Sequence, residues 1–228
     1  DTKDKYPTVK LKLNLDIADL EKLNLHAGPM KLRGNVDADI ANSNPDFLNG
    51  KVFLSNIQIL KEAEPIVLDS IRVLAFATKD SNSIKISSQF LKAEVVGKYK
   101  LTTLANSIQK SLSKYIDLQN PKANAEADEQ RLVFTLKVDN DPILFKLLPK
   151  LTGLEPFTIT GNYNNQTDSL AIKGAIPRIV YAENTISDAK INIEAKESAL
   201  EYLVSVATIE SGSLKIPFTS LSGNVQNN

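Results

Sequence analysis

The stretch that decides the fold is VKLKLNLDI, residues 9–17. Apolar residues alternate along it with Lys, Asn and Asp. Successive side chains of an extended chain point to opposite sides, so this pattern places every apolar side chain on one face. The stretch therefore predicts a β-strand with one apolar face and one polar face.

The same alternation returns along the chain, at residues 32–40, 71–77, 132–138, 157–163, 170–176, 189–195 and 214–218. We count about fourteen strand candidates of this kind, most of them separated by short turns such as KDSNS (79–83) and NNQTD (164–168). Short connections favour antiparallel neighbours. The sequence thus predicts a mainly β, antiparallel fold.

Two segments have helical periodicity instead. Apolar residues at three- and four-residue steps predict an amphipathic helix over residues 101–116, with Thr102 or Thr103 as its cap. Asp141 followed by Pro142 predicts the start of a shorter helix, which Pro149 should end. Residues 17–23 are a candidate for a third helical turn.

Two architectures fit these elements. About fourteen strands at roughly 4.8 Å each make a sheet on the order of 65 Å long, and two short helices cannot cover its apolar face. The sheet either curves into an elongated gutter with an apolar lining, or folds onto itself as a β-sandwich. We expect the strongly curved, elongated sheet, with the sandwich as the alternative.

The two halves of the chain resemble each other. GPMKLRGN (28–35) matches EPFTITGN (155–162), and VVGKY (95–99) matches LSGNV (221–225). Similar ends with shifted spacing predict two copies of one β-rich module. We expect a first module over residues 1–120, which ends in the helix 101–116, and a related second module over residues 121–228.

Composition excludes several classes of function. The chain of 228 residues carries 27 Lys+Arg against 27 Asp+Glu, a balance that does not suit a nucleic-acid-binding protein. It has no cysteine and a single histidine, His26, so thiolate and His-rich metal sites are not expected. We expect no metal, no cofactor and no enzymatic activity. The longest apolar run is five residues, 73–77, too short to cross a bilayer.

Several stretches resemble the large TamB-like proteins of Bacteroidetes, in the AsmA/TamB superfamily. They are IKISSQFLKAEVVGKYKL (84–101) with the helix after it, FTLKV (134–138), the turn LFKLL (144–148), TITG (158–161) and LSGNV (221–225). The resemblance implies a periplasmic β-rich body that belongs to a parent protein anchored in the inner membrane, and a chain that opens on Asp1 fits an excised internal piece. It also implies phospholipid transport to the outer membrane along an apolar groove, and contact of the parent protein with an outer-membrane assembly barrel. The family implies no catalytic residues.

The expected partners are phospholipid acyl chains. The inward residues of the alternating strands are the candidate lining of the groove: Val9, Leu11, Leu13, Leu15, Val36, Ile71, Val73, Leu132, Phe134, Leu136, Ile159, Ile172, Ile191 and Ile193. The helix 101–116 departs from a plain gutter, and we expect it to lie in the groove as a plug or to cap one module. Two alternatives stay open: a scaffold for outer-membrane protein assembly, and a β-sandwich binding module.

Overall fold

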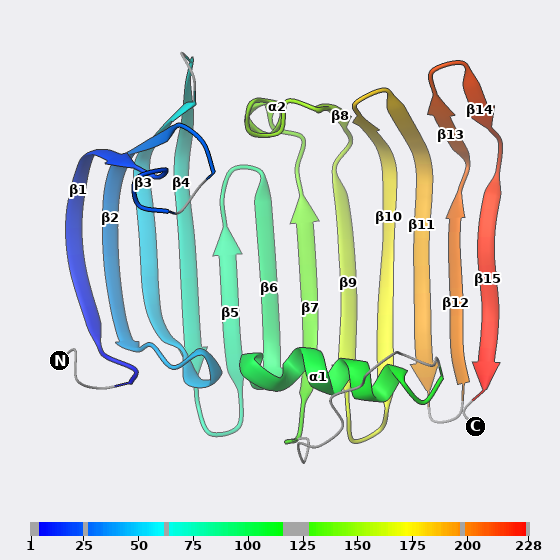
Figure 1. Cartoon of the computed structure of the whole chain (residues 1–228). Helices are drawn as coiled ribbons and strands as arrows, with labels where there is room; N and C mark the ends of the chain where they lie inside the picture. The colour runs from blue at the N-terminus through cyan, green and yellow to red at the C-terminus, as the bar shows by residue number, and fades with distance from the viewer. Residues whose placement is uncertain (1–4, 25–26, 62–63, 116–127, 197–198, 227–228) are drawn as a thin grey trace.

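The computed structural model describes residues 5–24, 27–61, 64–115, 128–196 and 199–226. They form one antiparallel sheet of 15 strands that stays open at both ends (Figure 1). Twelve strands lie side by side, and they are β1 (Val9–Asp19), β2 (Met30–Asn42), β3 (Asn49–Lys61), β4 (Glu64–Ala77), β5 (Asn82–Ser87), β6 (Leu91–Lys98), β7 (Arg131–Val138), β9 (Phe157–Asn164), β10 (Ser169–Tyr181), β11 (Asn184–Lys196), β12 (Ala199–Val206) and β15 (Thr219–Gln226). The short strands β8 (Leu151–Leu154), β13 (Thr208–Ser211) and β14 (Leu214–Ile216) pair at the margins.

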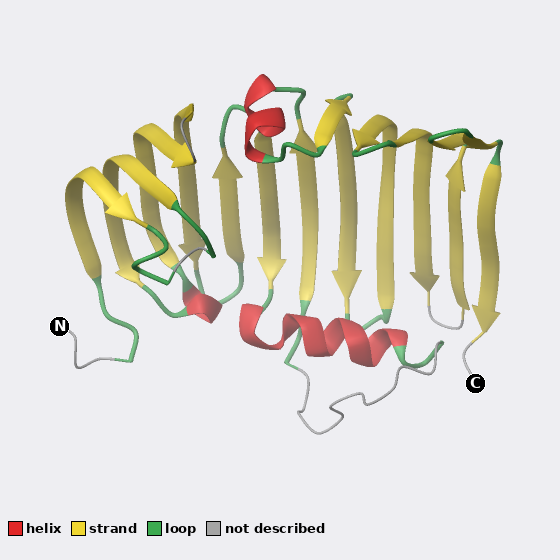
Figure 2. Cartoon of the chain, turned by 45° about the horizontal axis from the view of Figure 1, so that its top comes forward, coloured by secondary structure: helices red, strands yellow, loops and turns green. Residues whose placement is uncertain are grey.

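This arrangement confirms the expected curved, antiparallel sheet. The described residues form no second sheet stacked on the first, so the β-sandwich alternative is wrong. Long strands at one end of the sheet, β1 to β4, bend over its face in the tilted view (Figure 2). At β3 the bend coincides with a register shift against β2 and with Asn56, whose φ is 51°. Such an irregularity increases the local twist of a strand.

The sheet is continuous across the two halves of the sequence. Strand β6 pairs with β7 along their whole length, from Leu91 opposite Val138 to Lys98 opposite Arg131. Helix α1 (Leu101–Leu112) lies between these strands in sequence but leaves the sheet, so it does not interrupt the pairing. Each half contributes six of the twelve side-by-side strands. The duplication of a module over residues 1–120 and 121–228 stays a prediction.

The short helix α2 (Pro142–Leu147) covers one margin of the apolar face. As expected, Asp141 caps it, because its carboxylate accepts a hydrogen bond of 2.9 Å from the backbone N–H of Ile143. The buried Ile143 packs against Ile57, Ile66 and Leu68 of β3 and β4. Beside it, Leu144 joins a second apolar cluster with Leu151 and Leu154 of β8.

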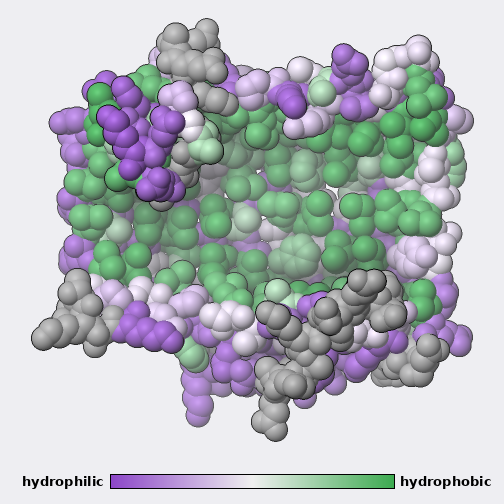
Figure 3. All heavy atoms as spheres, viewed as in Figure 1, coloured by the Kyte–Doolittle hydropathy of each residue, from purple (hydrophilic) through white to green (hydrophobic). Residues whose placement is uncertain are grey.

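Helix α1 covers the opposite margin, across the strand ends of the second half (Figure 1). It packs on the largest apolar cluster, whose buried members are Tyr99, Tyr115, Leu132, Tyr163, Leu170, Ala195 and Leu200. The face between α1 and α2 remains uncovered by any described helix, and apolar side chains gather over it (Figure 3).

Three details of the predicted helices need correction. Helix α1 ends at Leu112 and turns follow to residue 115, while residue 116 lies outside the described part. Its cap position is Lys100, without a side-chain hydrogen bond, and not Thr102 or Thr103. Residues 17–19 belong to β1 and residues 20–24 form turns, so the third helical turn is wrong.

Candidate functional site: an apolar trough across the sheet

Strand register lines up the apolar residues of different strands into rows. Residues directly opposite each other in an antiparallel pair point to the same face, so a chain of such partners defines one row of side chains across the sheet. On the apolar face, two complete rows cross all twelve strands. Row A consists of Val9, Ile40, Gly50, Ala75, Ile84, Val95, Phe134, Gly161, Ile172, Ile193, Tyr202 and Gly223. Row B consists of Leu11, Ala38, Val52, Val73, Ile86, Ala93, Leu136, Ile159, Gly174, Ile191, Val204 and Leu221.

Neither row contains a charged residue, and the hydroxyl of Tyr202 is the only side-chain polar atom in the two. We call the face of rows A and B, between α1 and α2, the apolar trough. Several of its side chains are open to solvent, such as Leu11 at 41% and Leu221 at 65% exposure. The trough is thus a surface feature of the described chain rather than a closed core.

The structure brings the fourteen predicted lining residues onto this one face. Val9, Phe134, Ile172 and Ile193 lie in row A, and Leu11, Val73, Leu136, Ile159 and Ile191 lie in row B. Leu13, Val36 and Ile71 form a shorter row with Leu54, and Leu15 lies opposite Gly34. Leu132 is also on this face, but it is buried in the cluster under α1.

A groove runs where α1 meets the sheet. It has a volume of about 630 Å³ and all its lining residues are hydrophobic. We call it the helix groove, and its lining consists of Val95, Leu104, Ile108, Leu112, Leu132, Phe134, Tyr163, Leu170, Ile172, Ile193, Leu200, Tyr202 and Val204. Helix α1 forms its wall through Leu104, Ile108 and Leu112, and row A contributes much of its floor.

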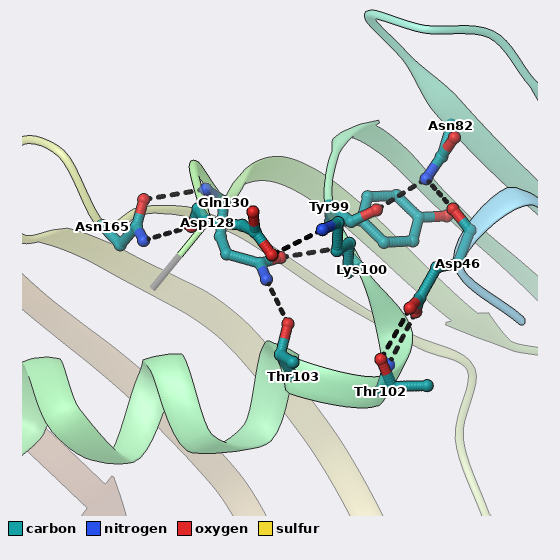
Figure 4. Close-up of polar contacts among 9 residues, drawn as sticks. All are labelled: Asp46, Asn82, Tyr99, Lys100, Thr102, Thr103, Asp128, Gln130 and Asn165. Carbon is teal, nitrogen blue, oxygen red and sulfur yellow. Dashed lines mark hydrogen bonds and ion pairs between the residues drawn. The ribbon is translucent and has the colours of Figure 1, made fainter. Parts of the chain in front are cut away.

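Polar contacts hold the start of α1 in place (Figure 4). The carboxylate of Asp46, from the 3₁₀ helix η1 (Pro45–Phe47), accepts hydrogen bonds from the backbone N–H of Thr102 at 2.9 Å and from its hydroxyl at 2.7 Å. The fully buried Gln130 accepts a bond of 2.9 Å from the N–H of Lys100 and donates one of 2.8 Å to the hydroxyl of Thr103. Helix α1 is therefore fixed to both halves of the sheet at its N-terminal end.

The other end of α1 is held by two further contacts. The hydroxyls of Ser111 and Tyr163 lie 3.0 Å apart, between the helix and β9. Lys114, just past the helix, forms an ion pair with Asp168 in the β9–β10 turn. Burial raises the pKa of Tyr163, so its hydroxyl keeps its proton to a higher pH than that of a solvent-exposed tyrosine. Anchored at both ends, the helix is a fixed wall of the groove.

The opposite face of the sheet is mainly polar, although the exposed Leu74, Phe76, Val133 and Leu203 also lie on it. Cross-strand ion pairs join Lys12 to Asp37 at 3.7 Å and Lys85 to Glu94 at 3.1 Å. Such exposed pairs contribute little stability, but they show that charged side chains gather on the face opposite the trough. The contrast between the two faces is what the alternating sequence pattern predicts.

The alternating pattern of the sequence did not predict every residue of the groove lining. Tyr202 and Val204 of β12 were not among the candidates, because Leu203 between them is also apolar and obscures the alternation. Leu203 lies on the polar face and is exposed. Only the register of β12 against Ile191 and Ile193 assigns Tyr202 and Val204 to the trough.

The described residues offer little other chemistry. Among them, no group of three or more His, Cys, Asp and Glu side chains could hold a metal ion. His26 lies outside the described residues. Within the same part of the chain, no helix has both the length and the apolar character needed to span a membrane. Comparisons with protein-family models, curated proteins and solved structures find no match.

Proposed function

We propose that this chain is a non-enzymatic section of a TamB-like protein that carries the acyl chains of phospholipids along its apolar trough. The observation that supports this function is that rows A and B cross twelve strands without a charged residue. The proposal places the chain in the periplasm, as part of a parent protein anchored in the inner membrane. The trough then serves transport of phospholipid toward the outer membrane.

The dimensions of the trough suit this role. Twelve strands span eleven spacings of about 4.8 Å, or roughly 53 Å. The hydrocarbon core of a bilayer is about 30 Å thick, so the chains of one leaflet extend about 15 Å. A chain of about 15 methylenes would cost on the order of 12 kcal/mol to expose to water, so a carrier needs an unbroken lining. Rows A and B provide an unbroken apolar lining that is longer than a single acyl chain.

Adjacent residues of β10 provide a matched test. Ile172 lies in the floor of the helix groove, while its neighbour Lys173 points to the polar face and is exposed. Replacing Ile172 by Glu places a carboxylate where the acyl chain would lie, and dehydrating it on binding is costly. We expect native mass spectrometry to show co-purified phospholipid on the wild-type chain and on Lys173→Glu, and little on Ile172→Glu. Circular dichroism checks that both variants keep the sheet.

Two outcomes would contradict the proposal. One is a wild-type chain that retains no lipid and binds no fluorescent fatty acid added to it. The other is an Ile172→Glu variant, folded as the wild type, that binds lipid equally well.

The open edges of the sheet favour a second candidate, a scaffold in outer-membrane protein assembly. Among the described residues, β1 and β15 each pair on one side only, which leaves a row of backbone groups that could pair with a client strand. The parent protein would deliver such clients to an outer-membrane assembly barrel. Photo-crosslinking from Lys10 and Asn224, with no lipid recovered, would favour this function over lipid transport.

A further inference from the structure

Two aromatic rings of row A lean over glycines of the neighbouring strand. A Cβ atom added to Gly161 would lie 2.6 Å from Cζ of Phe134. One added to Gly223 would lie 2.6 Å from Cζ and 2.8 Å from Cε1 of Tyr202. Each glycine is the direct cross-strand partner of its aromatic residue. The rings therefore occupy the space that a side chain at position 161 or 223 would fill.

This packing determines how deep the helix groove is. Phe134 and Tyr202 both line the groove. Side chains of a strand normally stand perpendicular to the sheet, and an upright ring here would project into the groove. Because the rings lie across the glycines instead, the floor of row A stays low along the flank of the helix.

We propose, on the basis of the function above, that Gly161 and Gly223 are specificity-determining residues, which keep the helix groove deep enough for one extended alkyl chain of a lipid. The chain would lie along row A, against the wall that Leu104, Ile108 and Leu112 form. The groove crosses six neighbouring strands, from Val95 on β6 to Tyr202 on β12. Five spacings of about 4.8 Å give roughly 24 Å, enough for an extended chain of one leaflet.

The lining chemistry favours an alkyl chain over a peptide. Apart from two tyrosine hydroxyls, the lining side chains offer no polar atom, and the hydroxyl of Tyr163 is already engaged with Ser111. A peptide laid in the groove would lose the hydration of its N–H and C=O groups without replacement bonds. An alkyl chain has no such groups to satisfy.

Gly223 is the better position for a test. The three nearest atoms to its added Cβ all belong to the Tyr202 side chain, so Gly223→Ala should turn the ring up into the groove. At Gly161 the added Cβ would also meet the backbone oxygen of Ala171 at 2.5 Å, which strains the strand itself. The matched control is Ser222→Ala, because Ser222 precedes Gly223 on the same strand and points to the polar face.

The measurement is binding of a fluorescent straight-chain fatty acid to the 228-residue chain, with a fluorescent sterol as a second probe. We expect Gly223→Ala to weaken fatty-acid binding about tenfold, which corresponds to about 1.4 kcal/mol, the contribution of roughly two methylene groups. The double variant Tyr202→Ala with Gly223→Ala removes the displaced ring, so it should regain at least wild-type affinity. Ser222→Ala should bind as the wild type does.

Each of the following outcomes would contradict a different statement. If the wild type binds the fatty acid and Gly223→Ala binds it equally well, the glycine does not determine the depth of the groove. If the sterol binds more tightly than the fatty acid, the occupant is a fused-ring lipid and not an extended chain. A wild-type chain that binds neither probe contradicts the proposed function as well. Should Gly223→Ala fail to fold, Tyr202→Trp, which adds a larger ring over the same glycine, tests the same point.

Discussion

At the scale of single residues, burial of polar groups has consequences that can be measured. Tyr99 is 3% exposed, and its hydroxyl finds no hydrogen-bond partner among the described residues. Burial raises the pKa of Tyr99 to about 12 from its usual value near 10. Loss of its proton is thus harder in the folded chain than in the unfolded one.

This difference predicts lower stability in strong alkali. The folded chain holds the Tyr99 proton more tightly than the unfolded chain, so the stabilisation is complete below pH 10 and is lost as the pH rises toward 12. A difference of two pH units corresponds to about 2.7 kcal/mol, which we take as an upper limit. Urea unfolding at pH 8, 10 and 12 measures this loss of stability. Tyr99→Phe should be as stable as the wild type at pH 8 and should lose less stability at pH 12; an equal loss in both chains would contradict the role of Tyr99.

The sequence predicts which face of the sheet a side chain occupies better than it predicts which other residues that side chain packs against. All fourteen candidate lining residues lie on one face, because a period of two residues determines which side of a strand each side chain takes. In a sequence, a glycine within an alternating run indicates a bulge or a bend of the strand. Gly34 and Gly97 do adopt positive φ, whereas Gly161 and Gly223 lie beneath rings from another strand. Those contacts depend on which strands are neighbours, and no local pattern encodes that.

At the scale of elements, α1 depends on residues distant in sequence for its start. Its cap residue Lys100 makes no side-chain bond to the helix, and Asp46 provides the acceptor for the N–H of Thr102 instead. A carboxylate near a helix N-terminus is also favoured by the helix dipole. Amphipathic spacing predicted the helix itself, but a cap supplied from more than fifty residues away leaves no local signature.

Removing this distant cap should destabilise the helix groove. We expect Asp46→Ala to lower the free energy of unfolding by about 1–2 kcal/mol, as loss of an N-cap does. It should also weaken fatty-acid binding, because the wall of the groove loses an anchor. Urea denaturation and the fluorescence assay measure the two effects. Asp80→Ala, in an exposed turn, is the control, and equal stability of the two variants would show that Asp46 does not hold α1.

At the scale of the whole molecule, alternation alone left two architectures open, because a sandwich and an open sheet both require one apolar face per strand. The difference lies in pairing. Strand β6 pairs with β7 and joins the halves into one sheet, so the apolar faces of both halves point the same way and cannot cover each other. The long connection between β6 and β7, which contains α1, is compatible with both an open sheet and a sandwich. For this reason the sequence alone does not distinguish the two architectures.

The open sheet predicts an extended particle in solution. A compact globule of 228 residues has a radius of gyration of about 17 Å. A slab about 53 Å long, built from side-by-side strands of 6 to 14 residues, should give about 19 Å or more. Small-angle X-ray scattering measures the radius of gyration. A dilution series shows whether association through the open edges of β1 and β15 increases it. A concentration-independent value near 17 Å would show that the sheet closes on itself in solution, and a closed sheet would have no trough for a lipid chain to enter.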